Sequence, residues 1–264
     1  FFLIPWRNHT LIGTTDKPFN GSPDEYRVTR QSIMELIDDV NSAFGDGKLS
    51  YEDVKHAYGG LRPLVERETS ETYSSSRKYE IFDNGSAGLD GMITVEGGKY
   101  TTSRRLAEKC LKIVGVKLGR KLGKSITAKQ YLAGCEIKDL NVFVKEAREQ
   151  NNGISPATLE YLARNYGTEY REIIKLVRED QSLSETLNDD GEIQAQVVYA
   201  VRREMARTLS DIVMRRTGIG TLGNPGEAVL RKAAVLAAKE LRWNKEKTEK
   251  EIAAVIDLLK IPVD

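Results

Sequence analysis

The chain has 264 residues, 40% of them hydrophobic, which suffices for one large or two ordinary domains with packed cores. Its 40 basic and 39 acidic side chains give a formal charge of +1, which excludes a general electrostatic attraction to nucleic acid and makes any anion binding local. Two cysteines and two histidines favour a reduced, cytoplasmic chain without a metal site, and no apolar run approaches the ~20 residues of a membrane-spanning helix.

Two short strands around a turn are predicted at the start of the chain. Residues 1–4 and 10–15 have strand-like patterns, and Arg7-Asn8-His9 separates them. A domain seldom begins within a sheet, and the first residues have neither the basic start nor the cleavage site of a signal peptide. We therefore expect the chain to be the C-terminal portion of a longer protein.

A helix is predicted next. Ser22-Pro23-Asp24-Glu25 combines an N-cap serine, a proline in the first turn and a glutamate three residues after the cap. The apolar positions that share one face of this helix are Ile33, Leu36, Ile37, Val40 and Phe44. Beyond it we expect a strand at residues 54–58 and a hairpin of residues 78–82 and 92–96. Residues 1–125 are thus predicted to form an α+β region.

The strongest candidate for a ligand site is the segment Gly97-Gly98-Lys99-Tyr100-Thr101-Thr102. It joins the second strand of that hairpin to a helical run. Two glycines allow the backbone to approach a ligand, and the free N–H groups of a first helical turn attract anions. A lysine and two threonine hydroxyls add further donors. We expect the chemistry here.

From residue 126 onward, helical periodicity replaces strand alternation and predicts an all-α domain at residues 126–264. Ser155-Pro156 begins one helix, Asn224-Pro225-Gly226-Glu227 begins another, and a last helix covers residues 245–259. A long helix is predicted over residues 192–216. Its expected buried positions are Ile193, Val197, Val201, Met205, Leu209, Ile212 and Val213.

The pattern G-x-G-x-x-G occurs at Gly218-Ile219-Gly220-Thr221-Leu222-Gly223. A dinucleotide fingerprint must follow a β-strand, whereas these glycines follow the predicted long helix. We therefore interpret the segment as a helix end and a loop between helices.

Three basic residues are candidates for binding a phosphorylated substrate. Arg62 lies in a Gly-Gly-x-Arg-Pro frame that fixes the direction of its guanidinium, although a surface arginine at a turn explains the pattern equally well. Arg77 precedes a predicted strand, and Lys99 adjoins the anion-binding segment. If a sheet brings them together, guanidinium groups would pair bidentately with phosphate oxygens and lysine would act as a point charge.

A local basic stretch follows the first helical run. Its members are Lys112, Lys117, Arg120, Lys121 and Lys124. Contact with anionic lipid is one interpretation, and a solvated helix end is the commoner one.

Five motifs in one order resemble the FAD-dependent glycerol-3-phosphate dehydrogenase family, from the middle of such a protein to its helical C-terminal domain. They are Gly13-Thr14-Thr15-Asp16, Gly60-Leu61-Arg62-Pro63-Leu64, Arg77 at a strand start, Gly97-Gly98-Lys99-Tyr100-Thr101-Thr102-x-Arg104, and Arg203-Glu204-Met205-Ala206-Arg207-Thr208-Leu209-x-Asp211 with Arg215-Arg216-Thr217. The resemblance covers nearly the whole chain. It implies the last part of a flavoprotein substrate-binding sheet and FAD domain, followed by the all-α domain.

The resemblance implies a function. The family oxidises sn-glycerol 3-phosphate to dihydroxyacetone phosphate, passing a hydride to the flavin and electrons to membrane quinone, while close relatives use oxygen. By position, Arg62 and Arg77 would bind the substrate phosphate, and Lys99 would lie at the substrate beside the flavin, so that Lys99 and Arg62 are the candidate catalytic residues. Gly97, Gly98, Lys99, Tyr100 and Thr101 would bind FAD, with their donors toward the flavin pyrimidine.

The family's own strand-turn-helix fingerprint for the FAD pyrophosphate is absent from these 264 residues. We therefore expect that this chain alone neither retains FAD firmly nor turns over. Two alternatives stay open: a helical interaction module without catalysis, and another FAD oxidase that acts on a carboxylate. Three further questions stay open: the identity of the electron acceptor, whether the protein forms a homodimer, and whether it contacts the inner face of the cell membrane peripherally.

Overall fold

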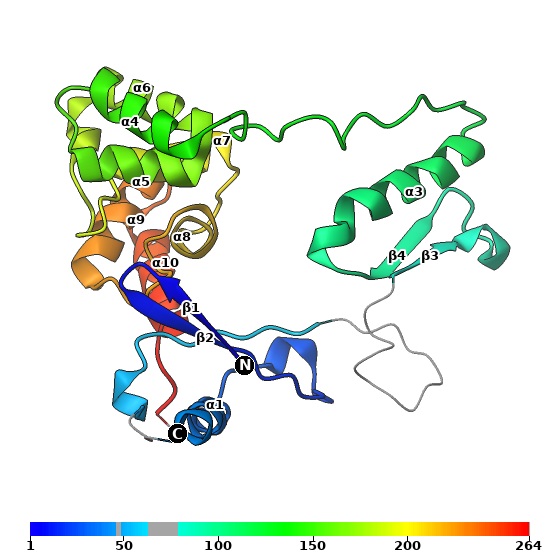
Figure 1. The fold of residues 1–264 in the computed structure, drawn as a ribbon, viewed down its shortest axis with the longest axis horizontal. Helices are drawn as coiled ribbons and strands as arrows, with labels where there is room; N and C mark the ends of the chain where they lie inside the picture. The colour runs from blue at the N-terminus through cyan, green and yellow to red at the C-terminus, as the bar shows by residue number, and fades with distance from the viewer. Residues whose placement is uncertain (46–48, 63–78, 264) are drawn as a thin grey trace. The chain divides into compact units, whose positions relative to one another are not determined.

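The computed structural model describes residues 1–45, 49–62 and 79–263 (Figure 1). The chain divides into two compact units, one of Phe1–Gly59 with Leu132–Asp264 and one of Gly60–Tyr131. Small antiparallel sheets and a helical C-terminal part confirm the predicted α+β class. The domain boundary between residues 125 and 126 stays a prediction.

The first unit begins with the predicted hairpin. Strands β1 (Phe2–Trp6) and β2 (His9–Gly13) are antiparallel, with Trp6 opposite His9. Arg7 and Asn8 form the turn with φ angles of 47° and 64°. Positive φ at both central residues gives the turn the twist that adjacent strands require.

The helix after the hairpin begins later than the sequence predicted. Pro23–Glu25 is a single 3-10 turn, and α1 extends over Arg30–Phe44. Thr29 and Ser32 cap α1 reciprocally, because each side chain accepts a hydrogen bond from the other residue's backbone N–H, whereas the Ser22 side chain caps nothing in the described structure. The predicted face is buried at Ile33, Ile37 and Val40, but Phe44 is exposed. Residues 54–58, predicted as a strand, are irregular.

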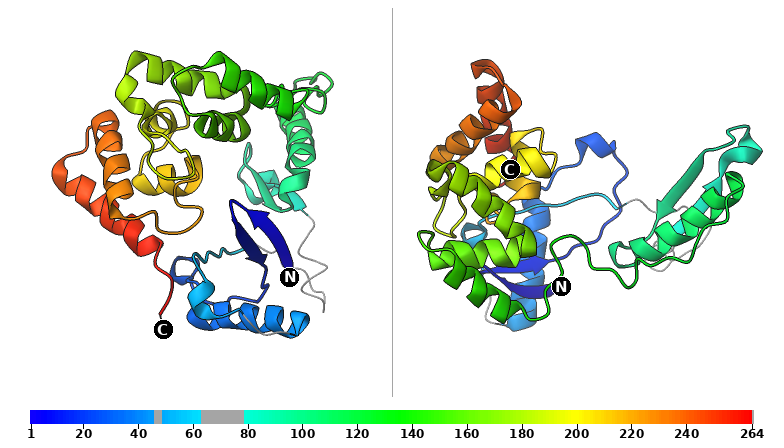
Figure 2. Two further views of the ribbon diagram at one scale, coloured as in Figure 1. Left: turned by 60° about the vertical axis from the view of Figure 1, so that its left-hand side comes forward. Right: turned by 90° about the horizontal axis from the view of Figure 1, so that it is seen from above.

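Helices make up the rest of the first unit (Figure 2). Their bounds are α4 (Leu140–Gln150), α5 (Pro156–Tyr166), α6 (Tyr170–Glu179), α7 (Gln194–Arg203), α8 (Leu209–Asp211), a π-helical turn (Ile212–Arg216), α9 (Glu227–Leu241) and α10 (Lys245–Leu258). Ser155 caps α5 and Asn224 precedes α9 as predicted. Helix α7 contributes to two apolar clusters, one with α4 to α6 and one with α8 to α10, and its residues 195–201 are all buried.

The long helix predicted over residues 192–216 is wrong, because the chain breaks after Arg203. The N–H groups of Glu204 and Ala206 both donate to the Ala200 carbonyl, and Met205 has a φ of 61° and is exposed. The Thr208 side chain then accepts from the backbone of α8. Apolar residues recur at helical spacing on both sides of this break, so periodicity alone does not reveal it.

The break places the Glu204 side chain against the interior. Its Oε2 atom is buried and makes no hydrogen bond within the described residues. Burial raises the pKa of this carboxyl above its ordinary 4.5, although Arg216 opposes the shift. Above that ordinary value the folded protein keeps a proton that the unfolded chain releases, so this group lowers stability as pH rises through the folded-state pKa.

We expect Glu204→Gln to remove this pH-dependent loss. Relative to the unchanged chain, the variant should gain stability progressively as pH rises above 4.5, measured as the urea-unfolding free energy at each pH. Glu146→Gln, at an exposed position of α4, is the control and should not change the slope. Equal pH profiles for Glu204→Gln and the unchanged chain would contradict this account of the break.

The second unit is a hairpin with one helix. Strands β3 (Tyr79–Asp83) and β4 (Ile93–Gly97) are antiparallel, as predicted, and a 3-10 turn at Tyr100–Thr102 leads into α3 (Ser103–Lys117). The Lys117 ammonium lies 2.8 Å from both Asp83 and Asp90, which fixes the end of α3 to the turn of the hairpin.

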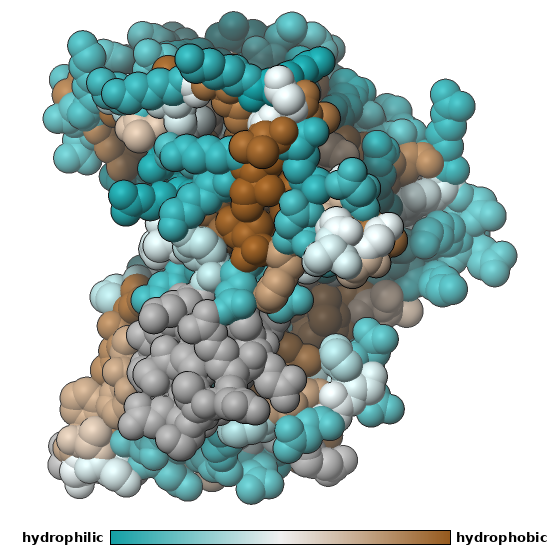
Figure 3. All heavy atoms as spheres, turned by 90° about the vertical axis from the view of Figure 1, so that its right-hand side faces the viewer, coloured by the Kyte–Doolittle hydropathy of each residue, from teal (hydrophilic) through white to brown (hydrophobic). Residues whose placement is uncertain are grey.

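Large apolar side chains of this unit are exposed, among them Met92, Leu111 and Val116. The face of the molecule shown in Figure 3 carries apolar surface among hydrophilic side chains. In the described part of the chain, no helix combines the length and the apolar character that crossing a membrane requires.

Candidate functional site

The segment between β4 and α3 adopts a backbone that favours glycine. Gly97 and Gly98 have φ angles of 69° and 101°, a region that residues with a Cβ adopt at a cost. A Cβ at Gly98 would be in ordinary contact with the Tyr79 Cβ, at 3.5 Å, so the backbone angle and not crowding accounts for this glycine. The chain then extends through Lys99 before the helical turns begin.

The start of α3 is left without a side-chain cap. The Thr102 hydroxyl donates to the Lys99 carbonyl at 3.1 Å, and the Ser103 hydroxyl donates to the Tyr100 carbonyl at 2.8 Å. Among the described residues, neither Lys99 nor Thr102 caps a first-turn N–H. In the described structure the Thr102 hydroxyl and the backbone N–H groups of Thr102 and Ser103 donate to carbonyls within the turn, and ligand binding by this segment stays a prediction.

The same segment is open to solvent. Lys99, Thr101 and Thr102 are exposed, and Tyr100 is 98% exposed. A cation, an uncapped helix start and a glycine turn thus occur together on one exposed loop. This donor set suits the polar, electron-accepting edge of a flavin or the oxygens of a phosphate.

The other two predicted cations are placed as follows. Arg62 lies in the same unit as Lys99, and its side chain is exposed. Arg77 lies outside the described residues. The convergence of Arg62, Arg77 and Lys99 on one anion stays a prediction.

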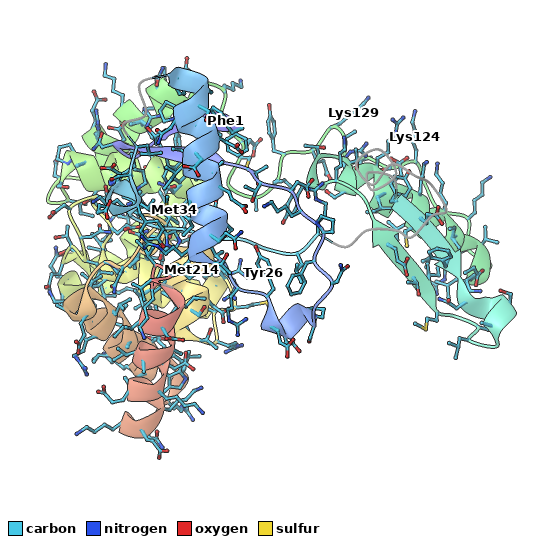
Figure 4. All side chains as sticks on the ribbon, turned by 90° about the horizontal axis from the view of Figure 1, so that it is seen from below. Phe1, Tyr26, Met34, Lys124, Lys129 and Met214 are labelled. Carbon is cyan, nitrogen blue, oxygen red and sulfur yellow. The ribbon has the colours of Figure 1, made fainter. Side chains whose placement is uncertain are left out.

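The basic stretch begins within α3, which contains Lys112 and ends at Lys117. Lys117 is held by its two aspartates, and Arg120, Lys121 and Lys124 lie in the irregular chain that follows α3. Figure 4 shows Lys124 and Lys129 pointing away from the ribbon. Contact with anionic lipid and simple solvation both stay predictions for these positions.

The glycines of the G-x-G-x-x-G pattern directly follow α8 and its π-helical turn instead of a strand, which confirms the loop interpretation. Each glycine is required by close packing. A Cβ at Gly220 would lie 2.7 Å from both Met214 and Val213, and a Cβ at Gly223 would lie 2.5 Å from the Lys55 carbonyl.

Sequence reasoning missed a buried polar cluster around Gly218. The Glu192 side chain is 0% exposed, and it accepts hydrogen bonds from the Tyr161 hydroxyl, at 2.5 Å, and from the Asn188 amide. Burial and then the Glu192 charge raise the pKa of Tyr161 well above its usual range. The Arg7 guanidinium faces Glu192 from the hairpin turn. The one sequence feature that could have indicated this cluster is Arg7, a charged residue at the turn of a largely apolar hairpin.

Residues 125–248 match the family described as the C-terminal domain of alpha-glycerophosphate oxidase. A glycerol-3-phosphate dehydrogenase from Synechocystis sp. is 32% identical over 254 residues, which cover 96% of this chain and 46% of that protein. The enzyme of the same name from Mycobacterium leprae is 28% identical and is covered to 43%.

The fold is also similar to a solved structure. The X-ray structure of the glycerol-3-phosphate dehydrogenase from Bacillus halodurans complexed with FAD is 25% identical, with a TM-score of 0.82 over 99% of this chain and 51% of that one. The chain thus spans about half the length of these relatives. These comparisons confirm the resemblance that the sequence motifs carried.

Proposed function

Since this chain belongs to the glycerol-3-phosphate dehydrogenase family, we propose that it forms the C-terminal portion of an FAD-dependent enzyme that oxidises sn-glycerol 3-phosphate to dihydroxyacetone phosphate. The observation that carries the proposal is the loop from Gly97 to Thr102. Its positive-φ glycines, its exposed lysine and a helix start without a side-chain cap would suit a flavin edge and a phosphorylated substrate.

FAD would supply the hydride acceptor. Gly97, Gly98, Lys99, Tyr100 and Thr101 would face it, with the backbone donors of the turn and the positive end of the α3 dipole toward the part of the ring where negative charge develops. The hairpin and α3 would hold the backbone of this loop in place for the reaction.

Lys99 would act at the substrate beside the flavin, and Arg62 and Arg77 would hold the phosphate. A guanidinium presents two parallel N–H groups to two phosphate oxygens, which orients the substrate as well as binding it. The ammonium of Lys99 would stabilise negative charge at the reacting oxygen. Transfer of electrons to membrane quinone, a homodimer and peripheral contact with the cytoplasmic membrane surface belong to the same proposal as family properties.

The isolated 264-residue chain is expected to purify without a stoichiometric flavin and without glycerol 3-phosphate oxidation. The reason is that the chain's G-x-G-x-x-G pattern follows a helical turn and, among the described residues, is not the strand-turn-helix fingerprint that would hold the FAD pyrophosphate. The flavin absorbance of the purified chain, compared with its protein concentration, measures this directly. One flavin per chain would contradict the expectation.

The proposed activity is tested in a protein that joins this chain to a flavin-binding half of the same family. Oxidation of sn-glycerol 3-phosphate with a quinone analogue as acceptor is the expected result. Oxidation of a carboxylate substrate in its place would favour another FAD oxidase, and no turnover with a fully bound flavin would favour an interaction module.

A further inference from the structure

Arg7 is a turn residue whose side chain is directed away from solvent. It stands at the turn between β1 and β2 with a φ of 47°, and its side chain is only 16% exposed. A positive φ is uncommon for arginine, so the contacts of the side chain must offset the cost of this backbone conformation.

The guanidinium of Arg7 meets four acceptors from the helical part of its unit. Its Nη1 donates to the Gly218 carbonyl and to the Thr221 hydroxyl, both at 2.8 Å. Its Nη2 lies 2.8 Å from an Asp190 carboxylate oxygen and 3.5 Å from Glu192 Oε2. The guanidinium carbon also lies 5.3 Å from the centre of the Tyr161 ring, within the range of a cation–π contact.

Glu192 makes this surface selective for a cation. Its side chain is 0% exposed, and a buried carboxylate that loses its counter-charge is strongly destabilising. The other side-chain donors to Glu192 are the Tyr161 hydroxyl and the Asn188 amide, and both of these groups are neutral. Arg7 therefore supplies a positive charge that these two neutral donors do not.

The strands of the hairpin are only partly buried. All five residues of β1 are exposed, whereas in β2 Leu11 and Ile12 are half-buried and Gly13 is covered by the Phe2 ring of the same hairpin. No side chain of either strand is fully buried against the helices, so apolar packing leaves part of the docking to polar contacts. Among the described residues of the hairpin, Arg7 is the one whose side chain hydrogen-bonds to the helical part.

We propose that the helical part carries an arginine-recognition socket, and that Arg7 occupies it to fix the β1–β2 hairpin in place. The socket is formed by Tyr161, Asp190, Glu192, Gly218 and Thr221. The chemical class it binds is a planar guanidinium. Its acceptors face both terminal nitrogens of the guanidinium, Nη1 and Nη2. A lysine ammonium has a single nitrogen, which cannot reach both groups of acceptors together.

The test is chemical rescue in the 264-residue chain, read by amide hydrogen exchange of the hairpin. In Arg7→Ala, exchange at the β1–β2 amides should rise roughly 10- to 100-fold, the range for lost hydrogen bonds to a charged group, while α9 keeps its protection. Methylguanidinium at a non-denaturing concentration should restore most of the hairpin protection. Sodium chloride and methylammonium at the same ionic strength should not.

Two further variants complete the experiment. Arg27→Ala is the matched control, because Arg27 is an exposed arginine of the same unit that bonds the backbone carbonyls of Asp24 and Tyr26, and it should leave the hairpin unchanged. If Arg7→Ala does not fold, Glu192→Gln keeps the shape of the socket without its charge, and it should raise hairpin exchange alone. Unchanged hairpin exchange in whichever of these variants folds, or equal rescue by methylammonium, would overturn the proposal.

Discussion

Replacing Lys99 with alanine is expected to lower kcat for glycerol 3-phosphate oxidation roughly 100- to 1,000-fold in a protein that joins this chain to a flavin-binding half. The ammonium would act on charge that develops during the reaction, so its loss removes stabilisation of the transition state more than binding of the substrate. Steady-state kinetics with varied glycerol 3-phosphate measure kcat and KM separately.

The same measurement on Arg62→Ala should give a different pattern. The phosphate group takes no part in the bond changes at the reacting carbon, so loss of its partner is expected to raise KM about 10- to 100-fold with a smaller change in kcat. Lys124→Ala is the control, since Lys124 is exposed on the chain after α3 and points away from it. Wild-type kinetics in both Lys99→Ala and Arg62→Ala would show that the exposed loop is not the site of the reaction.

Gly218→Ala is expected to destabilise the chain by about 2–4 kcal/mol, through crowding and through lost hydrogen bonds to charged groups. A Cβ at this position would lie 2.6 Å from both Arg7 Nη1 and Glu192 Oε1, and closer still to the Tyr161 hydroxyl. These three groups are hydrogen-bonded to one another or to Gly218 itself, so they have little freedom to move away.

The cost of Gly218→Ala is separable from the general cost of changing a glycine. Gly218 does not have a positive φ, so backbone strain does not contribute. Gly123→Ala adds a Cβ where no atom lies within 4 Å, and it should change the unfolding free energy little. The comparison uses urea-induced unfolding of the two variants and the unchanged chain. Equal stability of Gly218→Ala and Gly123→Ala would mean that the cluster relaxes around the added methyl group.

Local patterns in the sequence predicted most of the elements. Strand alternation located both hairpins, and Ser155-Pro156 located the start of α5, because these signals act within a few residues of one another. The start of α1 was misplaced, since the serine and proline at Ser22-Pro23 favour a helical turn but the reciprocal Thr29 and Ser32 bonds stabilise the helix seven residues later.

The candidate site was predictable where a short motif encodes a backbone shape. The pair Gly97-Gly98 preceded a helix in the sequence, and both glycines have positive φ in the structure. The Arg7 and Glu192 pair was not predictable, because the two residues are 185 positions apart and nothing local to either indicates the other. Burial of Glu192 follows from tertiary packing, and a single sequence does not record it.

Competition by inorganic phosphate tests the central claim, namely that Arg62, Arg77 and Lys99 surround one anion beside a flavin. In the joined protein, phosphate should inhibit competitively with glycerol 3-phosphate, and Arg62→Ala and Arg77→Ala should each raise its inhibition constant about 10-fold or more. Inhibition constants that stay equal in the unchanged protein and in both variants would contradict the claim.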